Sequence, residues 1–242
     1  MSFKDRTEII FGKKGMELLQ NSTVAVYGLG GVGASAALSL VRAGVGTIAV
    51  TDFDKIETSN LNRLAFGFES TVNLDKTEVF VKTALDINRE ISIISSKYFI
   101  HGEDAPQKLH NANFHIDAID TLNSKVNLII ALLEKGEKFI SSMGTGGKTK
   151  PELLQIADIW KTEMCPLSKL VRKRLKSRGI KGHFPVVFSK ETQVPPVERS
   201  DESFNSERMR KIQGSTPFVP QAAGLILASY AVRTILEDSL IF

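Results

Sequence analysis

The chain has 242 residues, a formal net charge of +4 and an ordinary share of hydrophobic residues, which is typical of a globular protein with one domain, or one domain and an appendage. Its single cysteine, Cys165, excludes an intramolecular disulfide and a cysteine-based zinc site. It also favours a reducing compartment, so we expect a cytoplasmic protein. The first ten residues, MSFKDRTEII, contain no apolar stretch of the kind found in a secretory signal.

Strands and helices are predicted to alternate along the first 142 residues. After a short helix at 14–21, apolar runs of strand length occur at 23–27, 47–51, 91–95, 114–119 and 138–142. Between them lie helical patterns at 34–43, 77–88 and 124–135. This order predicts an α/β fold of the Rossmann-like type, in which right-handed crossovers join the strands of a mostly parallel sheet.

The pattern changes after residue 147. Two further strands, at 153–159 and 185–189, are expected to flank a basic helix, and the polar segment 190–216 is expected to form a long loop. A last helix is predicted at about 221–236. Its apolar run, 222–232, is too short to span a bilayer, which favours a core or dimer-interface helix. Peripheral association with a membrane is the alternative for this helix.

The segment 169–181, KLVRKRLKSRGIK, carries seven basic residues and no acidic one. Leu170, Val171 and Leu175 lie on the other side of the helix that it predicts, so this helix is amphipathic. A cluster of like positive charges is typical of a surface that contacts the phosphate backbone of a nucleic acid. A solvated helix face is the alternative. The predicted nucleic-acid contacts are Lys169, Arg172, Lys173, Arg174, Lys176, Arg178 and Lys181.

A glycine turn follows the first predicted strand and precedes a helix. Gly28, Gly30 and Gly33 form the pattern G-x-G-x-x-G. Together with Gly31, they let the backbone approach a phosphate at the N-terminus of the helix. Asp52 ends the next strand, where a carboxylate accepts hydrogen bonds from ribose hydroxyls. Sites for NAD and for ATP share these features, so the turn alone leaves both ligands open.

The segment 52–64, DFDKIETSNLNRL, favours a nucleoside triphosphate. Asn60 is a residue that hydrogen-bonds phosphate oxygens, and Arg63 is one that binds them bidentately. Lys76 begins a predicted helix, where the cation and the helix dipole act on the same phosphates. An NAD enzyme has no general need for this set. We therefore expect ATP as the ligand, with Asp54 also in the binding site.

Two carboxylates lie near the end of the fourth predicted strand, in the sequence IDAIDTLNSK. Open α/β sheets bind ligands at the carboxyl ends of their strands, so Asp120 is expected to face the same crevice as the glycine turn. A carboxylate beside a triphosphate usually holds Mg²⁺, and this makes Asp120 the predicted metal ligand. Lys76 and Arg63 would stabilise charge during displacement. A helix cap is the alternative role for Asp120, and Asp117 is expected to be structural.

In order and spacing, these motifs resemble the ThiF-type adenylating family, which includes ubiquitin-activating enzymes and activators of sulfur carriers. The resemblance rests on GLGGVG, DFD, SNLNR, the lysine and the aspartate of IDAIDT, and it spans residues 24 to about 147. It implies that a substrate carboxylate attacks the α-phosphate of ATP with Mg²⁺, and that Asp120, Arg63 and Lys76 act in catalysis. It also implies a homodimer in which Arg6 reaches the nucleotide of the partner subunit.

The remaining motifs resemble one branch of this family, which dehydrates threonylcarbamoyladenosine in tRNA to a cyclic form. They are SSMG, QIADI, CPLSKLVRKRLK, GIKGHFPVVFS and FVPQAAGLILASYAVR. This resemblance implies tRNA as substrate and partner, which explains the basic helix, and a sulfur-transfer protein as a further partner. The expected organisation is one domain over 1–242. Its nucleotide-binding core is 1–147, and the extension 148–242 faces the tRNA and completes the sheet and the dimer.

Three alternatives stay open at this point. The adenylated substrate would instead be the C-terminus of a sulfur-carrier or ubiquitin-like protein, with Cys165 or a partner receiving the acyl group. An NAD-dependent oxidoreductase would explain the glycine turn and Asp52 only. A non-catalytic RNA-binding module would explain only the basic helix. The chain also departs from the family pattern at Leu64, Asn73 and Cys165, which are usually Gln, Gly and, in the dehydratase branch, Asp.

Overall fold

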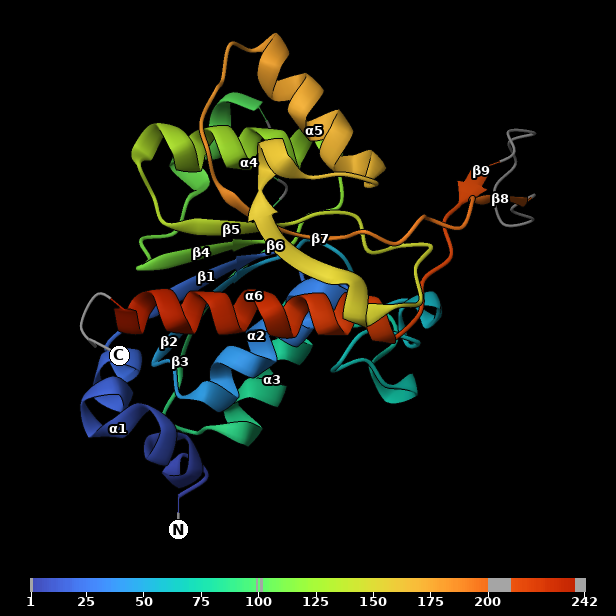
Figure 1. Cartoon of the computed structure of the whole chain (residues 1–242). Coiled ribbons are helices and arrows are strands. Elements are labelled where there is room, and N and C mark those ends of the chain that lie inside the picture. Colours follow the sequence, from blue (N-terminus) through green and yellow to red (C-terminus); the bar gives the residue numbers. More distant parts are fainter. Residues whose placement is uncertain (1, 99, 101, 200–209, 238–242) are drawn as a thin grey trace.

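The computed structural model describes the backbone of residues 2–98, 100, 102–199 and 210–237 (Figure 1). Its main feature is a seven-stranded sheet with the strand order β3-β2-β1-β4-β5-β7-β6. Within this sheet β6 runs antiparallel to β7, and the other neighbours are parallel. The predicted mostly parallel α/β sheet is therefore confirmed. The strands are β1 (Thr23–Tyr27), β2 (Thr47–Thr51), β3 (Ser92–Ser96), β4 (Phe114–Asp117), β5 (Phe139–Ser142), β6 (Leu154–Asp158) and β7 (Pro185–Ser189).

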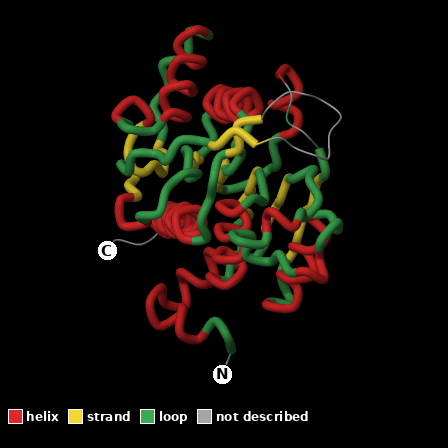
Figure 2. The backbone as a smooth tube through the Cα atoms, turned by 90° about the vertical axis from the view of Figure 1, so that its right-hand side faces the viewer, coloured by secondary structure: helices red, strands yellow, loops and turns green. Residues whose placement is uncertain are grey.

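Helices cover both faces of the sheet, and Figure 2 shows the strands between two helical layers. Val24 and Val26 of β1 belong to the hydrophobic cluster of one layer, whereas Ala25 and Tyr27 belong to the other. A strand covered on both sides is apolar at every position for this reason. One layer contains α1 (Asp5–Gln20), α2 (Gly31–Ala43), α3 (Lys76–Ile87) and α6 (Phe218–Glu237), and the other contains α4 (Leu122–Lys135) and α5 (Pro166–Ser177) (Figure 1).

Two regions differ from the sequence-based expectation. The first helix begins at Asp5 rather than at residue 14. It consists of two helical segments that meet at a kink at Gly12, whose φ is +69°, and together they form α1. The expected loop at 190–216 is wrong in part, because β8 (Val197–Arg199) and β9 (Arg210–Ile212) lie within it and pair as antiparallel strands. Val197 lies opposite Ile212 in this pairing, and such β-branched pairs favour a strand. Residues 200–209 lie outside the described part of the chain.

α6 packs closely on α2 because small residues line their contact. A Cβ placed on Gly224 would lie 2.3 Å from the carbonyl oxygen of Val32, so only glycine fits there. The Ser35 hydroxyl donates a hydrogen bond to the Gln221 carbonyl at 2.8 Å and ties the two helices together. In the described part of the chain, α6 is the one helix long and apolar enough to cross a membrane, and half of its apolar window is buried inside the molecule. These contacts pack α6 into the core, which is one of its two expected roles.

Candidate active site

The glycine turn joins β1 to α2, and its glycines serve different purposes. Gly28 has a φ of +89°, and a Cβ there would lie 2.8 Å from the Ala118 carbonyl oxygen at the end of β4. A Cβ on Gly33 would lie 1.7 Å from the Gly28 carbonyl oxygen, so Gly33 lets the helix pack on the turn. Gly30 instead faces open space, with nothing within 4 Å of a Cβ. A ligand can therefore approach the backbone at Gly30.

Asp52 fixes this turn from the end of β2. Its Oδ2 accepts a hydrogen bond from the Leu29 amide at 2.5 Å, and its Oδ1 accepts one from the Asp54 amide at 2.8 Å. Asp52 is 8% exposed, and this burial raises the pKa of its carboxyl, while the charge of Lys76 opposes the shift. Each carboxylate oxygen has a second lone pair, so Asp52 is still able to accept a bond from a ribose hydroxyl.

Lys76 begins α3 and points back at the carboxylates that follow β2. Its Nζ lies 2.9 Å from Asp54 Oδ2 and 3.8 Å from Asp52 Oδ1. The residue is only 7% exposed. The two carboxylates hold the ammonium group in place before any ligand arrives, and its third donor direction stays available. A cation fixed in this way needs little reorganisation when negative charge develops beside it.

Asn60 and Arg63 follow β2 in a short 3₁₀ turn and the loop after it. The Arg63 guanidinium donates hydrogen bonds to the Ser59 carbonyl and to Asn62 Oδ1, both at 2.8 Å. The stem of Arg63 crosses the start of α2, because a Cβ on Gly31 would lie only 3.0 Å from Arg63 Cγ. Gly31 therefore leaves room for this arginine at the N-terminus of the helix.

Asp120 lies three residues beyond the end of β4 and is exposed. The Thr121 hydroxyl donates a long hydrogen bond of 3.4 Å to its Oδ1. Thr121 is the N-cap residue of α4, and no side chain caps that helix. The alternative role of Asp120 as a helix cap is therefore wrong, and its carboxylate faces the pocket without a strong protein partner among the described residues.

Asp117 forms a buried ionic cluster at the end of β4. Its Oδ2 accepts hydrogen bonds from Lys125 Nζ and from Ser141 Oγ, each at 2.6 Å. The side chains of Asp117 and Lys125 are fully buried. Asp117 Oδ1 accepts a bond from the Ile119 amide at 3.0 Å, which fixes the turn leading to Asp120. The structural role expected for Asp117 is confirmed.

Two adjoining pockets at the carboxyl edge of the sheet bring most of the predicted residues together. Asp52 lines the first pocket, Arg63 lines the second, and Lys76 and Asp120 line both. Gly33 lines neither and acts behind the turn. The predicted nucleotide-binding residues that line one or both pockets are Gly28, Gly30, Gly31, Asp52, Asp54, Asn60, Arg63 and Lys76. The first pocket also contains Phe53, Tyr98, Ile100, Thr121 and Ser124.

The donor set of the double pocket fits a nucleoside triphosphate. The first pocket offers the Asp52 carboxylate and apolar or aromatic walls, which suit a nucleoside. The second offers Asn60, Arg63 and Lys76 beside the open backbone of Gly30, which suit phosphates. Among the described residues, no group of three or more His, Cys, Asp or Glu is placed to hold a metal ion. A metal at Asp120 would therefore need oxygen ligands from the nucleotide.

The far wall of the second pocket was missed by the sequence patterns. It consists of the loop 142–146 after β5, residues 213–215 and Pro220. Lys148 supports this loop from inside, because its Nζ donates to the carbonyls of Gly144 at 3.0 Å and Ser189 at 3.3 Å. Burial lowers the pKa of Lys148. The loop follows a parallel strand, so the rule that identified Asp120 applies to it equally.

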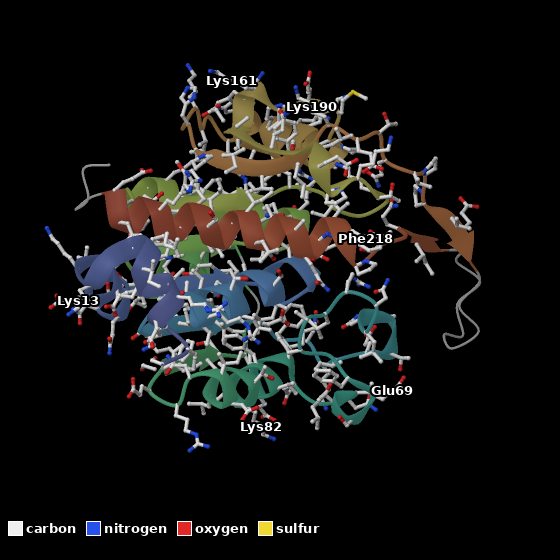
Figure 3. All side chains as sticks on the ribbon, turned by 60° about the horizontal axis from the view of Figure 1, so that its bottom comes forward. Lys13, Glu69, Lys82, Lys161, Lys190 and Phe218 are labelled. Carbon is white, nitrogen blue, oxygen red and sulfur yellow. The ribbon has the colours of Figure 1, made fainter. Side chains whose placement is uncertain are left out.

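Arg6 does not line the pocket of its own chain. It is exposed on α1, and the neighbouring Lys4 lies beside Gly44, whose Cβ would be 3.7 Å from Lys4 Cδ. Gly44 ends α2, a helix of 13 residues and therefore roughly 20 Å long, and the glycine turn lies at the other end of that helix. In Figure 3, Lys13 of α1 lies to the left, and Phe218, which begins α6, lies well to the right of it.

The seven predicted nucleic-acid contacts lie on α5 or just after it, in different environments. Arg172 is half-buried and donates hydrogen bonds to two carbonyls in the segment before the helix. Arg178 donates to Asn127 Oδ1 on α4 at 2.6 Å. The Nζ of Lys176 lies 5.6 Å from the centre of the Trp160 ring. All of these cations except Arg172 are exposed, including Lys169, Lys173, Arg174 and Lys181.

Comparison with known proteins identifies the family. The chain matches the ThiF family over residues 5–240. It is 41% identical to the tRNA threonylcarbamoyladenosine dehydratase of Bacillus subtilis (strain 168), over 96% of this chain and 94% of that protein. The Escherichia coli (strain K12) dehydratase is 32% identical over 96% and 93%. A crystal structure of the E. coli dehydratase TcdA in complex with ATP has a TM-score of 0.87 and 28% identity over 98% and 94%. The chain therefore belongs to the ThiF family and to its tRNA threonylcarbamoyladenosine dehydratase branch.

Proposed function

We propose that this protein uses ATP to dehydrate threonylcarbamoyladenosine in tRNA to its cyclic form, with release of AMP and pyrophosphate. The proposal rests on one observation, the double pocket. Asp52 lines the first pocket, Arg63 lines the second, and Lys76 and Asp120 line both. This site lies in a chain that matches dehydratases over nearly its full length. An NAD-dependent enzyme would give Arg63 and Asp120 no role.

The residues of the pocket prepare the first step. ATP supplies the adenylyl group that activates the threonyl carboxylate, with pyrophosphate as the leaving group. Asp52 binds the ribose and so sets the position of the α-phosphate. Lys76 and Arg63 bind phosphate oxygens and stabilise the negative charge that develops during displacement, because both cations are already fixed by protein partners.

Ring closure needs no residue as an acyl carrier. The carbamoyl group is on the same nucleoside as the activated carboxylate, so proximity gives it a high effective concentration. It attacks the acyl carbon and AMP leaves, which removes the elements of one water from the nucleoside. Cys165 is 5% exposed and lines neither pocket. This burial argues against the alternative in which Cys165 takes an acyl group from the C-terminus of a sulfur-carrier or ubiquitin-like protein.

The proposal includes Mg²⁺ held by Asp120 together with phosphate oxygens of ATP. It is supported by the exposed carboxylate of Asp120 at the boundary of the two pockets. Hard oxygen ligands from one carboxylate and the substrate phosphates are the usual environment of this ion.

We also propose a homodimer in which Arg6 completes the pocket of the partner subunit. On α1, Ile9 is 82% exposed and Ile10 is 70% exposed, and exposed apolar side chains grouped in this way favour a protein interface. An interface on α1 would bring Arg6 close to a second copy of the chain.

The tRNA is proposed to lie against α5, whose exposed cations supply a surface of one sign. The core 1–147 and the extension 148–242 are proposed to act as one domain, which is supported by the position of residues 213–215 and Pro220 in the wall of the second pocket. A buried lone thiol is consistent with a cytoplasmic location. A sulfur-transfer partner and a peripheral contact with a membrane stay predictions.

Turnover of tRNA that carries threonylcarbamoyladenosine, with ATP and Mg²⁺, tests the function. Mass spectrometry should detect the loss of one water from the modified nucleoside. Asp120→Ala should lower the rate by at least about 100-fold. Asp86→Ala is the matched control, because Asp86 is an exposed carboxylate of α3 that lines neither pocket. Pyrophosphate exchange without water loss would contradict the proposal and point to protein C-termini as substrates.

A further inference from the structure

A third pocket adjoins the first pocket, whose residues suit a nucleoside and which we call the nucleoside pocket. It lies between the first turns of α4 and the C-terminal end of α5, and its polar wall contains Thr121, Asn123, Ser124, Asn127, Arg174 and Arg178. Ile100, Thr121 and Ser124 also line the nucleoside pocket. A ligand in the third pocket would therefore be separated from a bound nucleoside by a single wall of side chains.

Ser124 is the first sign that the third pocket binds a ligand. The residue is 2% exposed, and its Oγ has no hydrogen-bond partner among the residues that the structure describes. A buried hydroxyl without a partner loses its bonds to water and gains none from the protein, so a native structure rarely keeps one without a reason. Because Ser124 lies in the wall of the pocket, a ligand with an acceptor oxygen would satisfy it.

The charges around this pocket favour an anion. α4 is a helix of 14 residues whose N-cap, Thr121, makes no side-chain capping bond, so the first amides and the helix dipole face outward. Arg174 and Arg178 reach the same pocket from α5. The bond from Arg178 to Asn127 Oδ1, at 2.6 Å, holds that guanidinium beside α4. Among the described residues no carboxylate lines this pocket, although Glu103 follows Gly102 and Asp120 precedes Thr121 in the chain.

We propose that the third pocket binds a backbone phosphate of the RNA strand that carries the substrate nucleoside. This inference rests on the proposed function. A phosphate accepts bonds from the α4 amides, the Ser124 hydroxyl and an arginine fork at the same time. The two arginines belong to the basic helix, so an RNA that lies along α5 passes this pocket on its way to the ATP site. The bound phosphate then sets which nucleotide of the strand reaches the α-phosphate of ATP.

The double variant Arg174→Gln, Arg178→Gln tests the pocket through separate KM values for tRNA and for ATP. We expect the KM for tRNA to rise about tenfold and the salt dependence of tRNA binding to weaken by a slope of about 1, as for one lost phosphate contact. The KM for ATP and the rate at saturating tRNA should not change. Arg42→Gln, Arg89→Gln is the matched control, because both arginines are exposed on the other side of the sheet.

Ser124→Ala tests the same pocket without a risk to folding. It removes a buried hydroxyl that has no partner, so we expect the thermal midpoint of the free protein to stay the same or rise. The KM for tRNA should increase several-fold, and by a larger factor than the KM for ATP, because Ser124 also lines the nucleoside pocket. An increase in the KM for ATP alone, in either variant, would assign the pocket to the nucleotide and overturn the inference.

The remaining outcomes separate this inference from the function on which it rests. Normal dehydration by the wild type, with no change in the KM for tRNA in either variant, would overturn the phosphate site alone. An absence of dehydration by the wild type would overturn the proposed function, and the phosphate site with it.

Discussion

Charged side chains are arranged in opposite ways at the carboxyl edge of the sheet and on α5. At the edge the two lysines are buried and paired, Lys76 with Asp54 and Lys125 with Asp117, and Asp120 is the exposed exception. On α5 most of the cations are exposed. Fixed charges act on a small ligand in one defined geometry, whereas exposed charges act on a large polyanion through their summed field. Single substitutions should therefore have large effects at the edge and small, cumulative effects on α5.

The largest effect is expected from Lys125→Met, which leaves the Asp117 carboxylate buried without its cation. We expect the free energy of unfolding to fall by about 3–5 kcal/mol, measured by urea denaturation. Lys82→Met, an exposed position of α3 labelled in Figure 3, should change it by about 0.5 kcal/mol or less. Adding Asp117→Leu to Lys125→Met should recover most of the loss. A double variant as unstable as Lys125→Met would show that the buried pair is not the cause.

Lys76→Met should lower kcat by about 100- to 1000-fold, because it removes a cation that Asp52 and Asp54 hold in place and that the proposed function assigns to the phosphates. Single-turnover kinetics with saturating tRNA and ATP would measure this. A decrease confined to the KM for ATP would mean that Lys76 binds the ground state and the transition state equally. A buried, paired cation would then have no larger effect on kcat than an exposed one.

The pH dependence of ATP use should reveal the burial of Asp52. The pKa of its carboxyl is raised, so protonation begins at a higher pH than in an ordinary aspartate. We expect kcat/KM for ATP to fall by about tenfold per pH unit on the acid side of that pKa, and Asp52→Asn should remove this limb. The effect on stability has the opposite sign, because ionising this buried group is unfavourable. Asp52 therefore contributes fully to the free energy of unfolding below the ordinary aspartate pKa. This contribution is lost as the pH rises through the raised pKa of the folded protein.

The smallest effects are expected on the exposed part of α5. Lys169→Gln and Lys173→Gln should each raise the KM for tRNA by about two- to fivefold, leave kcat unchanged and reduce the salt slope by about 1. Fluorescence anisotropy with labelled tRNA at several salt concentrations measures the slope. If one of these lysines had an effect as large as Lys76→Met, the exposed surface would contain a fixed contact after all.

The pocket was predictable wherever its residues follow strands directly. Asp52, Asp54 and Asp120 are close to strand ends, and parallel strands bring these ends to one edge, so local patterns were sufficient. The far wall was not predictable, because it is made by contacts between distant segments. The Asn62 side chain donates to the Ser215 carbonyl, 153 residues later, and no local pattern indicates this pairing.

Backbone geometry explains the other misses. Gly12 takes a left-handed φ inside α1, so the helical pattern breaks in the sequence although the element continues in the structure. No sequence pattern predicts the unsatisfied hydroxyl of Ser124, since serine is common in the first turn of a helix. Only the packing of α4 buries that hydroxyl.

The close packing of α6 on α2 has a consequence for the synthesis of the protein. The glycine turn leaves the ribosome early, but Pro220 lies 3.1 Å from the position of a Cβ on Gly31, and the Gln221 side chain donates to the Arg63 carbonyl at 3.3 Å. The second pocket is therefore closed by residues that are translated long after the glycine turn. A nascent chain would therefore hold an unfinished site until α6 has been made and has packed on α2.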